Sequence, residues 1–146
     1  MGFRSNLSRR GIVSSDEEVY IKTVLFRYQG APATMADTGL LTAAQLLTGI
    51  ILGTPTAAAA YTLPTGALLD AALTSFMTDY ASFDFSIINL SATDDDIITL
   101  TASDGITIVG SPYVNANEFE ASYYRNTGVF RCRKTADDTF VVYRIG

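Results

Sequence analysis

Residues 83–90 read Phe-Asp-Phe-Ser-Ile-Ile-Asn-Leu, a run rich in aromatic and aliphatic residues. It begins with apolar and polar residues in alternation, which is the pattern of a strand that buries one face. Residues 97–102, Ile-Ile-Thr-Leu-Thr-Ala, have similar β-branched character and follow a turn at Asp94, Asp95 and Asp96. Two such strands in succession predict a β fold.

Further short strands are expected around this pair. Asp104 and Gly105 both tolerate positive φ, so they predict a hairpin that joins the strand at 97–102 to residues 106–110. A second hairpin is expected between residues 128–134 and 139–145. Short strands at this spacing, separated by turns, predict a mainly β fold of the sandwich or barrel type, jelly-roll-like in character. The other expected strands are residues 18–28, 50–52, 60–63 and 118–125, with a loop at 112–117.

Two short helices are expected to plug or cap this fold. In the first, Thr42 and Gln45 have the spacing of a capping box, and Gly49 supplies a left-handed stop. Thr65 is expected to cap the second. The helices are predicted at 41–49 and 66–76, and the core-facing stripe of the second is Leu68, Leu69, Ala72, Leu73 and Phe76.

The chain is expected to divide into an N-terminal region, residues 1–39, and a β-rich body, residues 40–146. Residues 1–17 are rich in Ser and Arg and are predicted to form an extended arm that needs a docking partner to become ordered. The strand at 18–28 follows. Residues 29–38 contain Gly30 and Pro32 and are interpreted as a linker.

The composition indicates a protein that buries much of its surface in an assembly. Apolar residues make up 48% of the chain and charged residues 17%, whereas soluble domains usually carry about 25% charged residues. A monomer with so few charges risks adhering to its neighbours. We therefore expect a homo-oligomer, with a trimer favoured.

Charge is distributed unevenly along the chain. Residues 31–124 contain acids but no Lys or Arg, and all basic residues lie at the two ends. This distribution suits contact between the ends of one copy and the acidic body of the next, although the two regions could equally neutralise each other within one fold. It does not form the continuous basic face that nucleic acid requires. No run approaches the ~18 apolar residues of a membrane span.

The residues that most enzymes need are missing. The chain has no histidine, no phosphate-binding glycine motif and one cysteine, Cys132. Cys132 lies between two arginines in an expected strand, so alternation predicts that it faces the core. We expect neither enzymatic activity nor a cofactor or metal.

Asp94, Asp95 and Asp96 form a dense carboxylate cluster. Calcium takes six to eight oxygen ligands, so the cluster could supply part of a calcium site. The alternative is a solvated turn, and the spacing favours that reading because it lacks the glycine and distal glutamate of a calcium loop.

Aromatic and basic residues near the ends are candidates for contacts between subunits, since Tyr and Arg are enriched in interfaces. For Tyr123 and Tyr124 the alternative is one core tyrosine beside an exposed one. The candidates are Arg4, Arg9, Arg10, Tyr20, Phe26, Tyr28, Tyr123, Tyr124 and Arg125.

Several strings of small residues and strands resemble a module in structural proteins of marine tailed phages and large algal DNA viruses. They are residues 42–51, 53–58 and 61–65, followed by 83–89, 99–102 and 130–135. The resemblance covers about residues 40–146 and implies a virion component.

The function expected from residues and resemblance is that of a capsid cement, decoration or minor capsid protein. Its partners would be other copies of itself and the major capsid protein, and it would reside in the virion. The alternative is a tail, fibre or spike module that binds a host surface glycan or protein through an aromatic and polar groove. A cellular β-sandwich binding module is a third reading.

Overall fold

The computed structural model of the chain describes residues 28–74, 78–117 and 125–146. These residues form a mainly β fold with two short helices, which confirms the predicted fold class. The expected arm and nearly all of the strands expected at 18–28 and 118–125 lie outside the described residues. The elements are β1 (Ala33–Met35), β2 (Gly39–Leu40), α2 (Ala43–Leu47), β3 (Ile50–Gly53), β4 (Ala59–Thr62), α3 (Gly66–Leu73), β5 (Ser82–Asn89), β6 (Ile98–Thr101), β7 (Ile106–Val109), β8 (Tyr113–Val114), β9 (Thr127–Ala136) and β10 (Thr139–Arg144).

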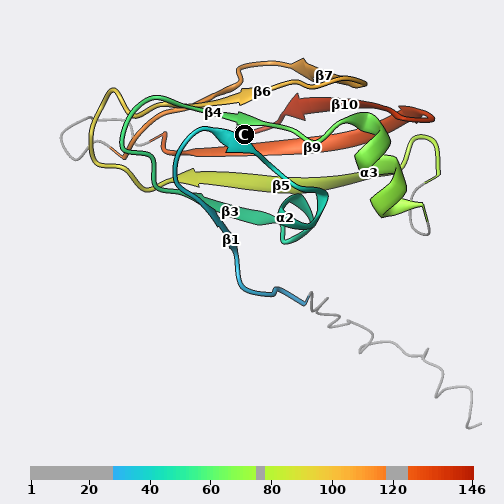
Figure 1. Ribbon diagram of the computed structural model, residues 1–146, viewed down its shortest axis with the longest axis horizontal. Coiled ribbons are helices and arrows are strands. Elements are labelled where there is room, and N and C mark those ends of the chain that lie inside the picture. The colour runs from blue at the N-terminus through green and yellow to red at the C-terminus, as the bar shows by residue number, and fades with distance from the viewer. Residues whose placement is uncertain (1–27, 75–77, 118–124) are drawn as a thin grey trace, which may run out of the picture.

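Two sheets face each other across one core (Figure 1). The six-stranded sheet has the order β1-β3-β5-β9-β10-β7, and the four-stranded sheet has the order β2-β4-β6-β8. As far as β8, successive strands therefore alternate between the sheets. The pairs β1–β3, β3–β5, β2–β4 and β4–β6 are all parallel. The first six strands thus form three stacked rungs, β1 with β2, β3 with β4 and β5 with β6, an arrangement that the sequence did not predict.

In the part of the chain that the structure describes, further strands cover one end of the stack of rungs. There, β9 pairs antiparallel with β5, and β8 pairs antiparallel with β6. At the other end, β1 and β2 are the edge strands of their sheets. The two edges are short, three and two residues, which limits the number of main-chain groups available to another strand.

The prediction of a hairpin at Asp104 and Gly105 is wrong. β6 lies in the four-stranded sheet, whereas β7 lies in the other sheet and pairs parallel with β10. Gly105 does have the positive φ, 77°, that the dipeptide predicts. The same conformation also allows the chain to cross from one sheet to the other, so the dipeptide alone does not distinguish the two outcomes. The hairpin between β9 and β10 is confirmed.

Two short strands fall in segments that the sequence assigned to coil. β1 lies within the expected linker at 29–38 and pairs with β3, Ala33 opposite Ile51 and Met35 opposite Gly53. β8 lies within the expected loop at 112–117. Strands of two or three residues are too short to show the alternation on which strand prediction depends.

Both helices begin where their caps predict. The capping box of Thr42 and Gln45 is present, and Gly49 has a φ of 79°. Thr65 Oγ1 accepts a hydrogen bond from the Leu68 N–H at 3.2 Å. The expected stripe of α3 is only half correct, since Leu69 and Leu73 are buried while Leu68 and Ala72 are exposed; Phe76 lies outside the described residues.

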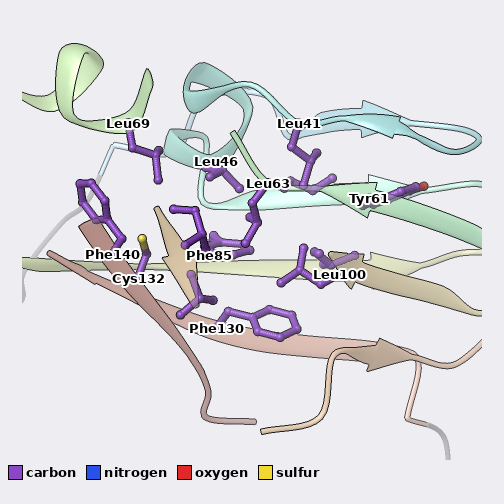
Figure 2. Packing of buried hydrophobic residues seen from close by; sticks show 14 of the residues in the cluster. Leu41, Leu46, Tyr61, Leu63, Leu69, Phe85, Leu100, Phe130, Cys132 and Phe140 are labelled. Atoms are coloured by element: carbon purple, nitrogen blue, oxygen red, sulfur yellow. The ribbon is translucent and has the colours of Figure 1, made fainter. Parts of the chain in front are cut away.

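The core lies between the sheets and beneath the helices (Figure 2). Phe85 of β5 stacks on Phe130 of β9 with ring centroids 5.4 Å apart. Cys132 is buried, as alternation predicts, and its neighbour Arg131 is exposed. Together the described residues bury the apolar side chains Leu41, Leu46, Ile51, Ala59, Tyr61, Leu63, Leu69, Leu73, Phe85, Ile87, Ile98, Leu100, Ile106, Val114, Ala116, Phe130, Cys132, Phe140 and Val142.

Candidate interaction surfaces

Two of the interface residues predicted from the sequence are described. Tyr28 is almost fully exposed, at 97%, and Arg125 is also exposed. They line different hollows of the surface, so the fold does not bring them together. The others, which lie outside the described residues, are Arg4, Arg9, Arg10, Tyr20, Phe26, Tyr123 and Tyr124.

An apolar hollow of about 440 Å³ lies at the N-terminal ends of the two helices. Leu41 and Leu63 are buried beneath it, while Leu40 and Leu68 are 71% and 60% exposed. No charged residue contributes to its lining, because the surrounding sequence from Thr38 to Leu69 contains none. The lining consists of Leu40, Leu41, Thr42, Ala43, Ala44, Leu63, Pro64, Thr65, Leu68 and Ser103.

The polar side chains of the apolar hollow are engaged within the chain. Thr42 and Thr65 accept hydrogen bonds from the first turns of their helices. Ser103 Oγ donates to the Pro64 carbonyl at 2.9 Å. Since these groups already have partners, the hollow presents mainly hydrocarbon to whatever contacts it.

A second hollow, which we call the β5 notch, lies beside the first half of β5 and measures about 500 Å³. β3 pairs with β5 only at Ser86–Asn89, because the chain enters β3 from α2 at Gly49. No strand of the described chain therefore flanks residues 82–85 on this side. The lining consists of Tyr28, Gln29, Leu46, Leu47, Thr48, Gly49, Ile50, Ser82, Phe83, Asp84, Phe85 and Ser86.

A third hollow, of about 580 Å³, combines an aromatic ring with arginines. Tyr113 is 56% exposed at its rim, and Arg125, Arg144 and Asn115 also line it. We call it the aromatic-polar hollow.

Arg144 is a structural part of the aromatic-polar hollow. Its guanidinium donates to the carbonyls of Tyr113 at 2.8 Å and Thr127 at 3.2 Å, and it lies 5.1 Å from the centre of the Phe130 ring. Burial, and then the nearby charge of Arg125, lowers the pKa of Arg144 from its ordinary value. Arg144 thus fixes the shape of the site, while the exposed Arg125 is the more accessible cation.

The acidic triplet does not act as a unit. Asp96 is 7% exposed, and its carboxylate accepts a hydrogen bond from Ser91 Oγ at 2.6 Å. Asp94 and Asp95 are exposed. Within the described ranges no group of three acidic, Cys or His residues is placed to hold a metal ion. Asp96 is thus held within the turn, while the side chains of Asp94 and Asp95 face solvent.

A buried ion pair joins α3 to β9, and sequence reasoning missed it. Lys134 Nζ lies 2.6 Å from Asp70 Oδ1, and Asp70 Oδ2 accepts the Asp138 N–H at 2.8 Å. The pKa of Asp70 is lowered most by the hydrogen bond from the Asp138 N–H and next by the hydrogen bond from the Lys134 ammonium. The hydrogen bond to Asp70 in turn raises the pKa of Lys134. Strand alternation gave one signal for its burial. Lys134 follows Phe130 and Cys132 at alternate positions of β9, so its side chain points to the same, inward face.

Cys132 cannot serve as a nucleophile in the folded protein. It is fully buried, and burial raises the pKa of its thiol to about 12. The reactive thiolate is therefore not formed at neutral pH.

Comparison of the chain with protein-family models, curated proteins and solved structures finds no match. The virion assignment accordingly stays a prediction. Among the described residues, no helix has the length and apolar character to cross a membrane.

Proposed function

We propose that this chain is a structural subunit of a virus particle, a cement, decoration or minor capsid protein that stabilises the shell through contacts with other subunits. The observation that carries the proposal is the apolar hollow with its exposed rim residues Leu40 and Leu68. Its occupant would be a second copy of the chain in the assembled particle. The resemblance of residues 40–146 to virion modules supplies the kind of assembly.

Several features of the molecule support a role in contact rather than in chemistry. Removing an uncharged apolar surface from water lowers the free energy of the system. Association of subunits covers such a surface and is therefore favoured. The polar groups around this surface are already satisfied, so covering them adds little desolvation cost. The body itself is held by an extensive core and by the buried pair of Asp70 and Lys134. A stable body that carries the apolar hollow on its surface suits a shell component.

The experiment measures how many copies of the chain purified particles contain. We expect a fixed copy number relative to the major shell protein, because each copy would occupy a repeated site. Leu40→Glu places a charge in the apolar hollow and should strongly reduce incorporation. Leu90→Glu is the matched control, since Leu90 is 47% exposed and does not line the hollow. Absence of the unmodified chain from purified particles would refute the proposal.

The aromatic-polar hollow favours a second candidate, a tail, fibre or spike module. A sugar ring can lie on the face of Tyr113 while Arg125 and Asn115 donate hydrogen bonds to its hydroxyls or carboxylate. Under this reading the chain binds host surface glycans, and Tyr113→Ala abolishes the binding. Tyr28→Ala is the control, since Tyr28 is exposed but lies in a different hollow. Equal glycan binding by both variants would exclude this candidate.

A further inference from the structure

The β5 notch has the position of a missing strand. Sheet order places β3 between β1 and β5, but β3 begins at Ile50, opposite Ser86. Before that point the row between β1 and β5 contains no strand of the described chain. Neighbouring strands lie about 4.8 Å apart, so one extended peptide has the width of one row of the sheet.

The hydrogen bonds on either side of β5 show which main-chain groups face the notch. The N–H of Asn89 donates to Asn126 O and that of Lys134 donates to Ala81 O, so odd-numbered residues of β5 bond toward β9. Toward β3, the N–H of Ser86 donates to Gly49 O at 2.9 Å. Antiparallel pairing alternates in this way. The even-numbered residues, beginning with Ser82, therefore direct their main-chain groups into the notch.

The far wall of the notch is the chain just before β1. Tyr28 and Gln29 line the hollow, and Gln29 Nε2 donates to the Thr48 carbonyl at 2.7 Å, which holds this wall against the end of α2. The described chain thus begins at the notch itself. Residues 1–27 precede it, and residues 18–27 include the segment with the strongest strand character outside the described ranges.

We propose that residues 18–27 of a second copy fill the β5 notch by adding a strand beside β5. A second copy is favoured over the same chain because Tyr28 and Gln29 already form the wall, so the chain's own segment would have to reverse direction to enter. Residues 18–27 contain no Gly, Pro, Asn, Asp or Ser, the residues that make such reversals.

The side chains of the notch match this occupant. Phe83 and Phe85 lie on the core side, where the apolar residues of the segment can pack. Asp84 lies on the outer side, where Arg131 contacts it at 2.7 Å. The segment carries Lys22 and Arg27 against one acid, Glu18, so its net charge is +1, and it is attracted to this acidic body. Main-chain hydrogen bonds would hold the strand, and these side chains would set its register.

This inference rests on the proposed function, since it names a contact by which the subunits of the assembly would be joined. An arm that leaves one copy and enters the notch of the next makes a head-to-tail contact. Such contacts generate a closed ring when the rotation between copies permits it. A ring of three copies is the arrangement favoured from the sequence.

Disulfide trapping tests the proposal, because the only native thiol, Cys132, is buried and unreactive. One copy carries Ser82→Cys in the notch. A second copy of distinguishable mass carries Lys22→Cys or Thr23→Cys, which lie on opposite faces of the expected strand. The full-length copies are mixed, allowed to exchange and oxidised. The control replaces Ser82→Cys by Thr107→Cys, which is exposed on β7 at the far edge of the same sheet.

We expect a disulfide between the two copies with Ser82→Cys and its loss with Thr107→Cys. Absence of the Ser82 disulfide would overturn the inference. So would an intrachain disulfide at high dilution in a chain that carries both substitutions, because the arm would then fill its own notch. If the protein still enters particles without any Ser82 disulfide, the arm placement is wrong and the proposed function stands. If it is absent from particles, the proposed function fails separately.

Discussion

Asn89 is the buried polar residue on which the join between the two sheets depends. It is fully buried at the end of β5. Its Nδ2 donates to the Asp96 carbonyl at 2.7 Å and to the Val114 carbonyl of β8 at 3.2 Å, and its Oδ1 accepts the Ser91 N–H at 3.0 Å. The substitution Asn89→Ala therefore removes three hydrogen bonds and leaves their backbone partners without this side chain.

The expected loss of stability follows from these three bonds. A neutral hydrogen bond contributes about 1 kcal/mol net, so the variant should lose about 3 kcal/mol of unfolding free energy. The cavity that the substitution leaves adds to this loss. Against a typical stability of about 5–15 kcal/mol, a loss of this size is substantial. For a chain of this length it lowers the melting temperature by roughly 6–12 °C.

Urea unfolding at one fixed protein concentration measures the effect. The midpoint should fall while the dependence on urea stays constant, which indicates a change in stability rather than in mechanism. Asn115→Ala is the matched control, because Asn115 is exposed and its loss should change stability by less than about 0.5 kcal/mol. If Asn89→Ala also falls within that range, the assigned hydrogen bonds do not join the sheets.

Four further predictions concern the body and the arm. Asp70 has a lowered pKa in the folded protein, so its carboxylate stabilises the fold above its ordinary pKa, and that contribution is lost as pH falls below about 4; acid titration of unfolding should show a smaller loss in Asp70→Asn. Cys132, with a pKa of about 12, should resist thiol reagents at neutral pH until the protein unfolds; rapid labelling of the native protein would contradict its burial. Gly66→Ala should lower the melting temperature, because a Cβ there would lie 1.9 Å from the main-chain oxygen of Asp138; an unchanged melting temperature would contradict that close approach. Deletion of residues 1–28 should leave a folded body with weaker assembly, as circular dichroism and sedimentation would show, whereas an unfolded product would mean that the deleted strand belongs to the protein's own sheet.

The arginines of the arm give a graded comparison for that deletion. Replacing Arg4, Arg9 and Arg10 together should weaken assembly less than the deletion does, since exposed ion pairs contribute only about 0–1 kcal/mol each. The main change expected is a weaker dependence of assembly on salt.

Local signals predicted much of the fold. The caps at Thr42 and Thr65, the strand at 83–90 and the hairpin of β9 and β10 each depend on residues close together in the sequence. The burial of Cys132 followed from alternation alone. In each case the determining interactions join residues close together in the sequence, so the local pattern predicts the structure.

These local signals did not predict which strands pair with one another. Asp104 and Gly105 specify a turn, but they do not specify whether the next strand pairs with the last one or crosses to the other sheet. The parallel stacking of β1, β3 and β5 joins segments separated by the helices, and no local pattern encodes it. The exposure of Leu68 has the same origin, since the position of α3 over the core leaves one side of its apolar stripe uncovered.

The candidate surfaces were predicted in part. The low charged fraction predicted contact between copies but not its location; the apolar hollow lies within the uncharged stretch from Thr38 to Leu69 apart from Ser103. The aromatic-polar hollow could not be located, because it brings Tyr113 together with Arg125 and Arg144 only through the fold. The β5 notch arises from the difference in length between β3 and β5, which the sequence predicted only approximately.

Contact between copies is tested by the mass of the full-length chain in solution, measured by sedimentation equilibrium at micromolar concentration. Because the apolar hollow and the arm both favour contact between copies, we expect a mass of two or more subunits, with three copies favoured. A mass that corresponds to the monomer throughout the concentration range would contradict it.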